Sequence, residues 1–239
     1  MRVLYDVTRP LVAGIPVWPG DVPCRFAWTA RLEDGAAYNA SELCMSTHTG
    51  THADGPFHVL PDGIRIGEAP LDAYLGPARL VDAAGRDRLD AAWAAEVLAA
   101  GTPGRLLVHT GAWTDPAVFP TRFAALDEES ARMLVDAGVR LFGTDAPSPD
   151  AFDSAGLPAH RILLGAGAGI IENLLLDGVP TGEYELIALP LRLVESDGSP
   201  VRAVLRGIER TAADLPSPGH AQLRPPPPAN RAGGKREGG

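Results

Sequence analysis

The alternation of apolar and polar positions along the chain predicts an α/β fold. Four short apolar runs have the length and composition of strands, at residues 3–7, 79–83, 105–109 and 139–143. Two longer segments between them, residues 90–100 and 127–137, have the pattern of helices. Strands and helices that alternate in this way form a sheet with helices packed against it.

End signals mark the second helix and a third, shorter one. Asp127 suits the N-cap, acidic residues follow in the first turn where the helix dipole favours them, and Gly138 comes just after the end. Further along, Pro158 can open a short helix that carries His160. Both helices are therefore bounded by residues suited to those positions.

Three more strands complete the predicted sheet. Residues 40–47 form a strand that leads directly to His48. Residues 184–191 are apolar enough for a central strand, and residues 200–206 form the last one. The folded core should end near Glu209.

The composition fits one catalytic domain followed by a tail. With 239 residues, of which 45% are hydrophobic, the chain can bury a core without disulfides. We expect the domain to span residues 1–210, and we expect residues 211–239, which are rich in Pro and Gly, to be disordered. Cys24 and Cys44 form no CxxC motif and are expected to be buried thiols rather than a redox pair or zinc ligands.

Charge and hydropathy exclude two classes of partner. The net charge of −9 leaves no broad basic surface for a phosphate backbone, so nucleic acid is not an expected partner. No apolar run approaches the roughly 20 residues of a membrane span, and the first residues lack a signal pattern. The sequence therefore predicts a cytoplasmic protein without membrane contact.

The strongest chemical signal is the segment from residue 48 to residue 58. It contains His48, His52, Asp54 and His58, and thus three of the six histidines of the chain. Imidazole and carboxylate groups are the ligands of a borderline divalent metal ion. Three imidazoles and a carboxylate at such spacing rarely arise by chance, so the segment predicts a metal-dependent hydrolase.

The glycines and the proline of this segment decide its geometry. Gly50, Gly55 and Pro56 disfavour a helix, and in an extended strand the positions 48, 52 and 54 share one face. We expect these three side chains to converge on one ion. His58 follows the Gly55–Pro56 break and is expected to be a catalytic group beside the metal.

A second candidate ligand lies far along the chain. Glu172 is embedded in the apolar run Ile170-Ile-Glu172-Asn-Leu, where a carboxylate is costly unless a cation or hydrogen bonds compensate it. We interpret it as a candidate metal ligand, with a salt bridge or a helix-start role as the alternative.

These motifs resemble the metal-dependent cyclase family, which includes bacterial formamidases. The segment His48-Thr-Gly-Thr-His52-Ala-Asp54-Gly-Pro-Phe-His58 and the context of Glu172 carry the resemblance. Four further stretches support it: Pro16-Val-Trp18-Pro-Gly-Asp21, Leu71-Asp-Ala-Tyr-Leu-Gly-Pro77, Gly143-Thr-Asp-Ala-Pro-Ser148 and Leu186-Ile-Ala-Leu-Pro-Leu191. The resemblance extends from residue 3 to residue 209.

The resemblance implies two divalent metal ions per subunit, usually zinc, with manganese as the alternative. His48, His52 and Asp54 would hold the first ion. Asp54 would also reach a second ion that His160 completes, and Glu172 would contact both.

Other implied features concern the substrate pocket and the fold. His58 would be the proton donor or acceptor, and Trp18 would line a pocket for a small aromatic amide. The family resemblance also implies a single-domain swivelling β/β/α fold with a mixed sheet and flanking helices, and a homodimer.

The implied activity is hydrolysis of N-formyl-L-kynurenine to L-kynurenine and formate, the arylformamidase step of tryptophan degradation. Formamidases often carry a second histidine at the position of Arg161, so a cyclic amide such as isatin, or an amide of secondary metabolism, remains an alternative substrate. A catalytically silent metal-binding protein whose Pro-rich tail docks a partner is the alternative from another class. Turnover of any amide would separate it from an enzyme.

Overall fold

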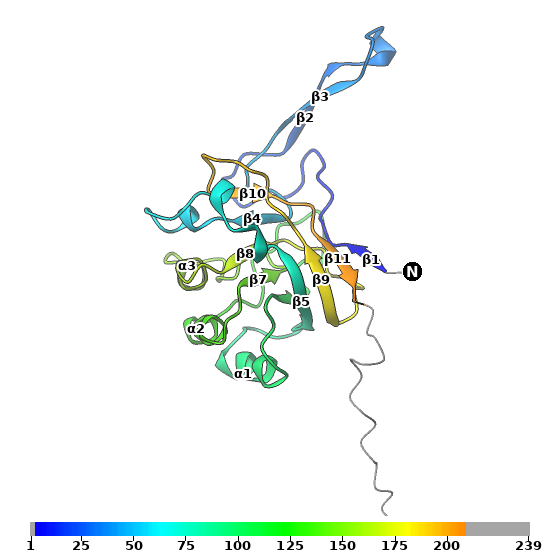
Figure 1. Ribbon diagram of the computed structural model, residues 1–239. Coiled ribbons are helices and arrows are strands. Elements are labelled where there is room, and N and C mark those ends of the chain that lie inside the picture. The colour runs from blue at the N-terminus through cyan, green and yellow to red at the C-terminus, as the bar shows by residue number, and fades with distance from the viewer. Residues whose placement is uncertain (1–2, 209–239) are drawn as a thin grey trace, which may run out of the picture. The chain divides into compact units, whose positions relative to one another are not determined.

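A computed structural model of the protein describes residues 3–208 and shows one large mixed sheet with helices against it (Figure 1). Nine strands lie in the order β1-β11-β9-β5-β6-β7-β8-β4-β10. Their bounds are β1 Leu4–Asp6, β4 His52–Asp54, β5 Leu75–Asp82, β6 Leu106–His109, β7 Leu141–Thr144, β8 Gly169–Glu172, β9 Gly182–Ile187, β10 Gly198–Pro200 and β11 Val204–Gly207. The strands β2 (Arg25–Ala30) and β3 (Ala40–Cys44) form a separate two-stranded sheet.

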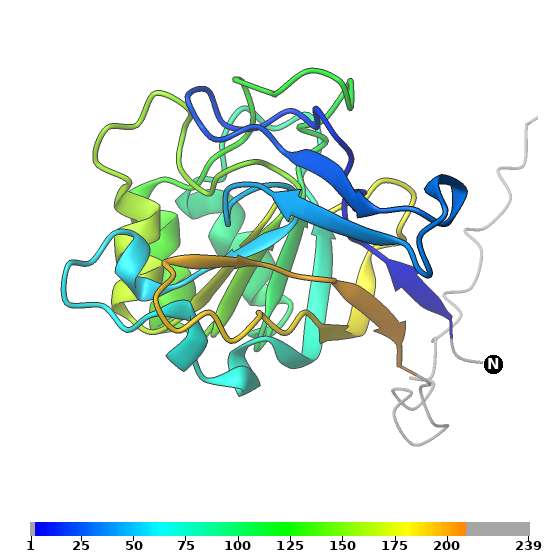
Figure 2. The same cartoon turned by 90° about the horizontal axis from the view of Figure 1, so that it is seen from above.

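The centre of the large sheet is a parallel unit. Strands β5, β6, β7 and β8 are parallel neighbours, and all other pairs in this sheet are antiparallel. The three crossovers between the parallel strands contain α1 (Ala91–Ala99), α2 (Glu128–Asp136) and α3 (Pro158–Gly165). The helices lie side by side on one face of the sheet (Figures 1 and 2). The predicted α/β fold class, with a mixed sheet and flanking helices, is confirmed.

The core is divided between the two faces of the parallel strands, because successive side chains of a strand point to opposite sides. Leu106 and Val108 of β6 belong to the apolar cluster under the helices, together with Trp93 of α1 and Leu134 of α2. Leu107, between them, belongs to the cluster on the other face. These strands are therefore buried on both faces, which accounts for the continuous apolar run Leu106–Val108 in β6.

The ends of the helices follow the capping signals of the sequence. The Asp90 side chain accepts a hydrogen bond from the Trp93 N–H at 3.0 Å, and Asp127 does the same for Ser130 at 2.8 Å. Gly138 adopts a φ of 93° just after α2, in the left-handed region that glycine tolerates. Pro158 occupies the first turn of α3, so all three predicted helices are confirmed.

Several strand predictions were wrong in extent. The strand expected at residues 184–191 is β9, which ends at Ile187. Residues 47–50 form a turn in which Gly50 has a φ of 67°, so β4 begins only at His52 and the extended strand from 48 to 54 does not exist. A left-handed glycine redirects the chain where alternation alone predicted continuation. The predicted strand at residues 200–206 is likewise interrupted at residues 201–203 and divided between β10 and β11.

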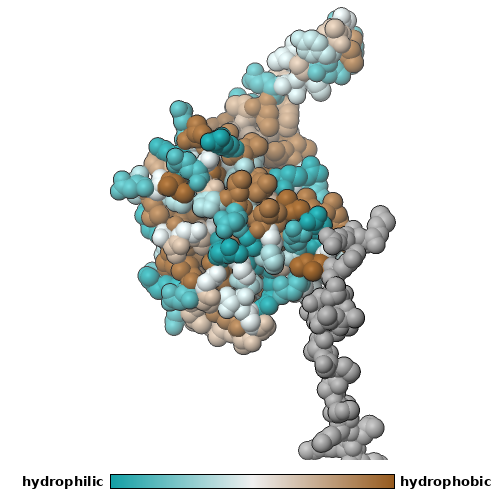
Figure 3. All heavy atoms as spheres, in the orientation of Figure 1, coloured by the Kyte–Doolittle hydropathy of each residue, from teal (hydrophilic) through white to brown (hydrophobic). Residues whose placement is uncertain are grey.

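The two-stranded sheet of β2 and β3 projects from the rest of the domain as a hairpin arm (Figure 1). Nearly all its residues are exposed, including Phe26, Trp28 and Leu43, and Figure 3 shows apolar and polar side chains mixed on its surface. The sequence analysis missed β2 and treated residues 40–47 as part of the main sheet. Cys44 on this arm is exposed, which corrects the expectation of a buried thiol, whereas Cys24 is buried as expected.

Within residues 3–208, none of the helices combines the length and the apolar character that crossing a membrane requires. The segment 211–239, predicted to be a disordered tail, lies outside the described residues.

Candidate active site

The candidate site lies where β4 is inserted between β8 and β10. In the antiparallel register, His52 of β4 lies opposite Glu172 of β8, and Asp54 lies opposite Gly198 of β10. His160 reaches the same place from α3, and His48 from the turn that precedes β4. Strand pairing thus brings together residues that are far apart in the sequence.

The first group of candidate ligands contains His48, His52 and Asp54. Asp54 Oδ1 lies 3.0 Å from His48 Nδ1 and 3.3 Å from His52 Nε2. The predicted convergence of these three side chains is therefore present, although a turn rather than a continuous strand produces it.

The second group contains Asp54, His160 and Glu172, all buried. His160 Nε2 lies 3.5 Å from Asp54 Oδ2 and 3.2 Å from Glu172 Oε1, while Glu172 Oε2 lies 3.1 Å from His52 Nε2. Each of the two carboxylates thus directs one oxygen to each group. Asp54 and Glu172 connect the two groups.

The atoms that face one another in this cluster are suited to a cation. His52 Nε2, both oxygens of Asp54 and Glu172 Oε1 are buried and have no hydrogen-bond partner among residues 3–208. Buried carboxylate oxygens and imidazole nitrogens without partners are costly unless a cation binds them. Nitrogen and oxygen donors of this kind are the ligands of zinc and related divalent ions, so the residues fit a metal centre.

Each imidazole of the two groups is oriented by a hydrogen bond at its other nitrogen. His52 Nδ1–H donates to the Gly50 carbonyl at 2.9 Å, and His160 Nδ1–H donates to Asp150 at 2.7 Å. His48 Nε2–H donates to Asp197 Oδ2 at 3.0 Å. In the neutral ring, the remaining nitrogen carries a lone pair toward the carboxylates, where either a metal ion or a proton can bind it.

The carboxylates make the cluster strongly attractive to positive charge. Burial acts to lower the pKa of His48, but the hydrogen bond to Asp197 and the nearby Asp54 carboxylate raise it to about 9. Burial also acts to lower the pKa of His52, but the nearby carboxylates of Asp54 and Glu172 raise it to about 10. Burial acts to raise the pKa of the Asp54 carboxyl, yet the surrounding imidazoles hold it well below its usual range. The site therefore stabilises cations, whether protons or metal ions.

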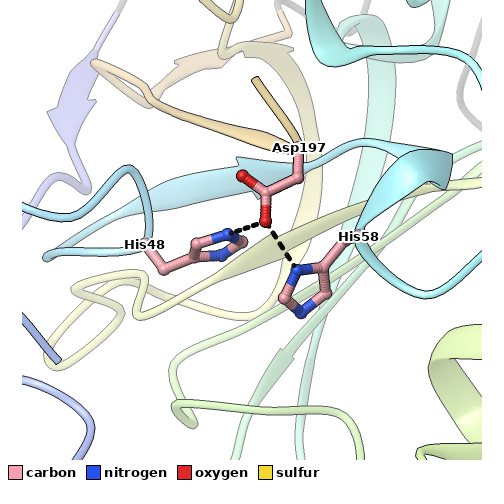
Figure 4. A group of neighbouring side chains, drawn as sticks. All are labelled: His48, His58 and Asp197. Carbon is pink, nitrogen blue, oxygen red and sulfur yellow. Dashed lines mark hydrogen bonds and ion pairs between the residues drawn. The ribbon is translucent and has the colours of Figure 1, made fainter. Parts of the chain in front are cut away.

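His58 lies beside the ligand groups, at the end of the 3₁₀ turn Pro56–His58. Its Nδ1–H donates to Asp197 Oδ2 at 3.1 Å, the same oxygen that accepts from His48 (Figure 4). These two hydrogen bonds hold the pKa of the Asp197 carboxyl far below its usual range. His48, His58 and Asp197 are close enough together to hold an ion themselves, but in this arrangement the carboxylate accepts from both rings.

Neither Asp197 nor Asp150 was predicted from the sequence. Asp197 is 139 residues from His58 along the chain, and Asp150 is 10 residues before His160. Both are acidic residues in loops, and local periodicity says nothing of loop side chains. An Asp just before a Gly at the start of a strand is the only local mark of Asp197.

A cavity of about 700 Å³ opens onto the two ligand groups. Trp18 forms part of its wall and packs against the rings of Phe119 and Phe152, with centroids 5.5 and 5.1 Å away. The cavity is also lined by Arg9, His48, His52, His58, Trp113, His160, Glu172, Asn173 and Asp197. All seven site residues expected from the sequence thus lie in or directly beside one cavity that can accommodate an aromatic molecule.

Known proteins resemble this chain over most of its length. A family described as putative cyclase matches residues 5–151. Kynurenine formamidase of Paracidovorax citrulli is 45% identical over 210 residues, which cover 86% of this chain and 97% of that protein. Kynurenine formamidase of Geobacillus thermodenitrificans is 43% identical over 206 residues, with coverage of 86% and 98%.

Solved structures agree with these sequence relatives. A protein described as a potential metal-dependent hydrolase with cyclase activity has a TM-score of 0.76 and 33% identity, covering 88% of this chain and 100% of its own. Isatin hydrolase A of Labrenzia aggregata has a TM-score of 0.74 and 28% identity, covering 86% and 93%. Because the family match includes more than half of the chain and the relatives align along nearly their whole length, the protein belongs to the cyclase family.

Proposed function

We propose that the protein is an arylformamidase that hydrolyses N-formyl-L-kynurenine to L-kynurenine and formate. The observation that carries this proposal is the pair of buried carboxylates, Asp54 and Glu172, which divide their oxygens between two imidazole groups beside an aromatic-lined cavity. Three kynurenine formamidases that are 43–45% identical to the chain support this choice of substrate.

The proposed centre holds two divalent ions, zinc in the first instance and manganese as the alternative. His48 Nδ1, His52 Nε2, Asp54 Oδ1 and Glu172 Oε2 would hold one ion, and Asp54 Oδ2, His160 Nε2 and Glu172 Oε1 the other. Such ions lower the pKa of water toward neutrality and polarise a carbonyl oxygen. The other parts of the reaction fall to the side chains.

His58 is the proposed acid–base group. Because Asp197 accepts the Nδ1 proton, Nε2 is the nitrogen left to face the cavity that His58 lines. As the oxygen of a water molecule bonds to the formyl carbon, Nε2 takes up a proton of that water, and it passes this proton to the anilide nitrogen as the bond between that nitrogen and the formyl carbon breaks. Without this proton the departing group would be a strongly basic anilide.

Asp197 is the proposed positioning residue for both His58 and His48. One of its oxygens accepts from both rings, which fixes the tautomer of each. The carboxylate behind the His48 imidazole also helps to raise the pKa of that ring. Asp197 would therefore connect the ligand set with the proton donor.

Trp18 is proposed to contact the aryl ring of the substrate, because it lines the cavity and its own ring is held by two phenylalanines. A homodimer and a cytoplasmic location complete the proposal, as the resemblance to bacterial formamidases implies.

The test is formate release from N-formyl-L-kynurenine by the purified full-length protein, before and after chelation and with zinc or manganese restored. We expect chelator-sensitive turnover that one metal recovers. His58→Ala should lower kcat by about 10² to 10⁴ while metal content stays constant. His109→Ala, which removes an imidazole that does not line the cavity, should retain activity.

Two outcomes would reject the proposal. Metal-loaded protein that releases no formate but opens isatin would be a cyclic-amide hydrolase, like its structural relatives. Metal-loaded protein that turns over no amide would be a silent metal binder.

A further inference from the structure

Arg9 is a cationic residue fixed close to the candidate metal centre. Its backbone N–H donates to Thr51 Oγ1 at 2.8 Å, and Thr51 Oγ1 donates to the carbonyl of Asn173 at 2.7 Å. Thr51 directly precedes His52, and Asn173 directly follows Glu172. Through Thr51, the backbone of Arg9 is therefore held next to β4, which carries His52, and next to β8, which carries Glu172.

The guanidinium of Arg9 is buried without a hydrogen-bond partner. The residue is only 6% exposed, and its Nε and Nη2 find no acceptor among residues 3–208. Its Cζ lies 4.0 Å from the centroid of the Trp113 ring, so the group is held flat by an aromatic face. A buried charge left in this state is destabilising unless something compensates it.

The nearest carboxylates do not supply the missing acceptor. Asp145 accepts from the backbone N–H and the hydroxyl of Thr110 and from the Gly111 N–H, and Asp177 accepts from His109. Burial lowers the pKa of Arg9 to about 10, an effect that the charges of Asp145 and Asp177 oppose. The guanidinium is therefore a cation at neutral pH, with free donors.

Arg9 lines the same cavity as His58 and Trp18. Guanidinium donors form a planar fork that matches a carboxylate through two parallel hydrogen bonds. A carboxylate that enters the cavity would give Arg9 the acceptors that residues 3–208 do not provide.

We propose that Arg9 binds a carboxylate of the substrate and thereby selects aryl amides that carry an acidic side group over neutral ones. This inference rests on the proposed arylformamidase function and deepens it. In N-formyl-L-kynurenine, the group bound is the carboxylate of the amino-acid side chain. Arg9 would set specificity and take no part in the proton transfer.

The test compares N-formyl-L-kynurenine, whose side chain ends in a zwitterionic amino acid, with 2-formamidoacetophenone, which lacks that amino-acid group, in wild type and Arg9→Met. We expect Arg9→Met to lower kcat/KM for the substrate with the carboxylate by about 10², mainly through KM, and to leave the other nearly unchanged; a contact to the ammonium group alone would not respond to this substitution. Arg9→Lys keeps the positive charge but cannot form two parallel hydrogen bonds, so its kcat/KM for N-formyl-L-kynurenine should lie between those of wild type and Arg9→Met. Arg86→Met, at an exposed arginine paired with Glu96, is the matched control and should affect neither substrate.

A stability measurement separates recognition from packing. Because the unpaired charge is costly in the empty cavity, Arg9→Met should not lower Tm, whereas a purely structural arginine would lower it. Equal losses for both substrates, or no loss for either, would overturn the proposal.

A binding experiment distinguishes this inference from the proposed function. Calorimetric titration with L-kynurenine and with 2-aminoacetophenone needs no turnover. Tighter binding of L-kynurenine by wild type, lost in Arg9→Met, supports the role of Arg9 even if formate is never released. Equal affinity of wild type for the two ligands overturns it even if formate is released.

Discussion

At the scale of single residues, the tautomers of the histidines are set from outside the two ligand groups. One oxygen of Asp197 accepts a hydrogen bond from His48 and another from His58. Asp150 accepts one from His160, and the Gly50 carbonyl accepts one from His52. An imidazole in the wrong tautomer can neither ligate an ion nor transfer the required proton. These outer acceptors therefore matter nearly as much as the ligands themselves.

The substitution Asp197→Asn, which hardly changes the shape of the side chain, tests whether this acceptor is needed to orient His48 and His58. An amide oxygen in the place of Oδ2 can still accept from both rings, but without the negative charge its hydrogen bonds to them are weaker. We expect kcat to fall at least about 10²-fold at saturating metal, with KM close to that of wild type, and metal affinity to fall about 10–100-fold. Steady-state kinetics and competition with a chromogenic chelator measure the two effects, and wild-type values of both would exclude a positioning role.

At the scale of elements, the parts that the sequence predicted are those determined locally. Asp127 and Gly138 bound α2 because a cap acts within one turn, and the apolar run at residues 105–109 became β6 because both faces of that strand are buried. Asp197 could not be found in this way, since its partner His58 is 139 residues away and only strand pairing joins them. The hairpin arm was not predicted either, because its strands are exposed on both sides and so lack the alternation of apolar and polar residues that marks a half-buried strand.

The pairing of β4 with β10 also explains why residue 198 is a glycine. Gly198 lies opposite Asp54, and a Cβ at this position would come within 2.8 Å of His48 Cε1 and 3.0 Å of His48 Nε2. The backbone of β10 thus forms a surface against which the imidazole of His48 rests. A methyl group there would push the ring away from Asp54 and Asp197.

Gly198→Ala is therefore expected to weaken metal binding about 10-fold or more and to lower activity in proportion. Gly165→Ala, at the end of α3, is the matched control because its Cβ would meet nothing within 4 Å. Metal content after dialysis against increasing chelator is the measurement. Unchanged retention in Gly198→Ala would mean that His48 can bind from a displaced position.

At the scale of the whole molecule, the candidate ligands join distant parts of the chain. They come from the turn before β4, from β4 itself, from α3 and from β8. Ions bound here would fasten these elements to one another in the folded state only. Ligands that bind the native state alone raise the free energy of unfolding, by about 4 kcal/mol at a concentration 1,000 times Kd.

Chelation should accordingly lower the Tm of the protein by on the order of 10 °C, and restored metal should reverse the change. Differential scanning fluorimetry with and without chelator measures it. Asp54→Ala, which removes the carboxylate shared by both groups, should melt at the same temperature in both conditions. If the Tm of the wild-type protein is the same with and without chelator, the metal centre contributes nothing to stability.

The position of Asp197 in the chain has a consequence for biosynthesis. The ribosome makes the turn and the strand that carry His48, His52 and Asp54 early, and β10 with its preceding Asp197 comes after every other part of the site. A nascent chain that already contains all five proposed ligands still lacks the acceptor for His48 and His58. A metal centre built from these residues would therefore reach its final geometry only after β10 has been translated.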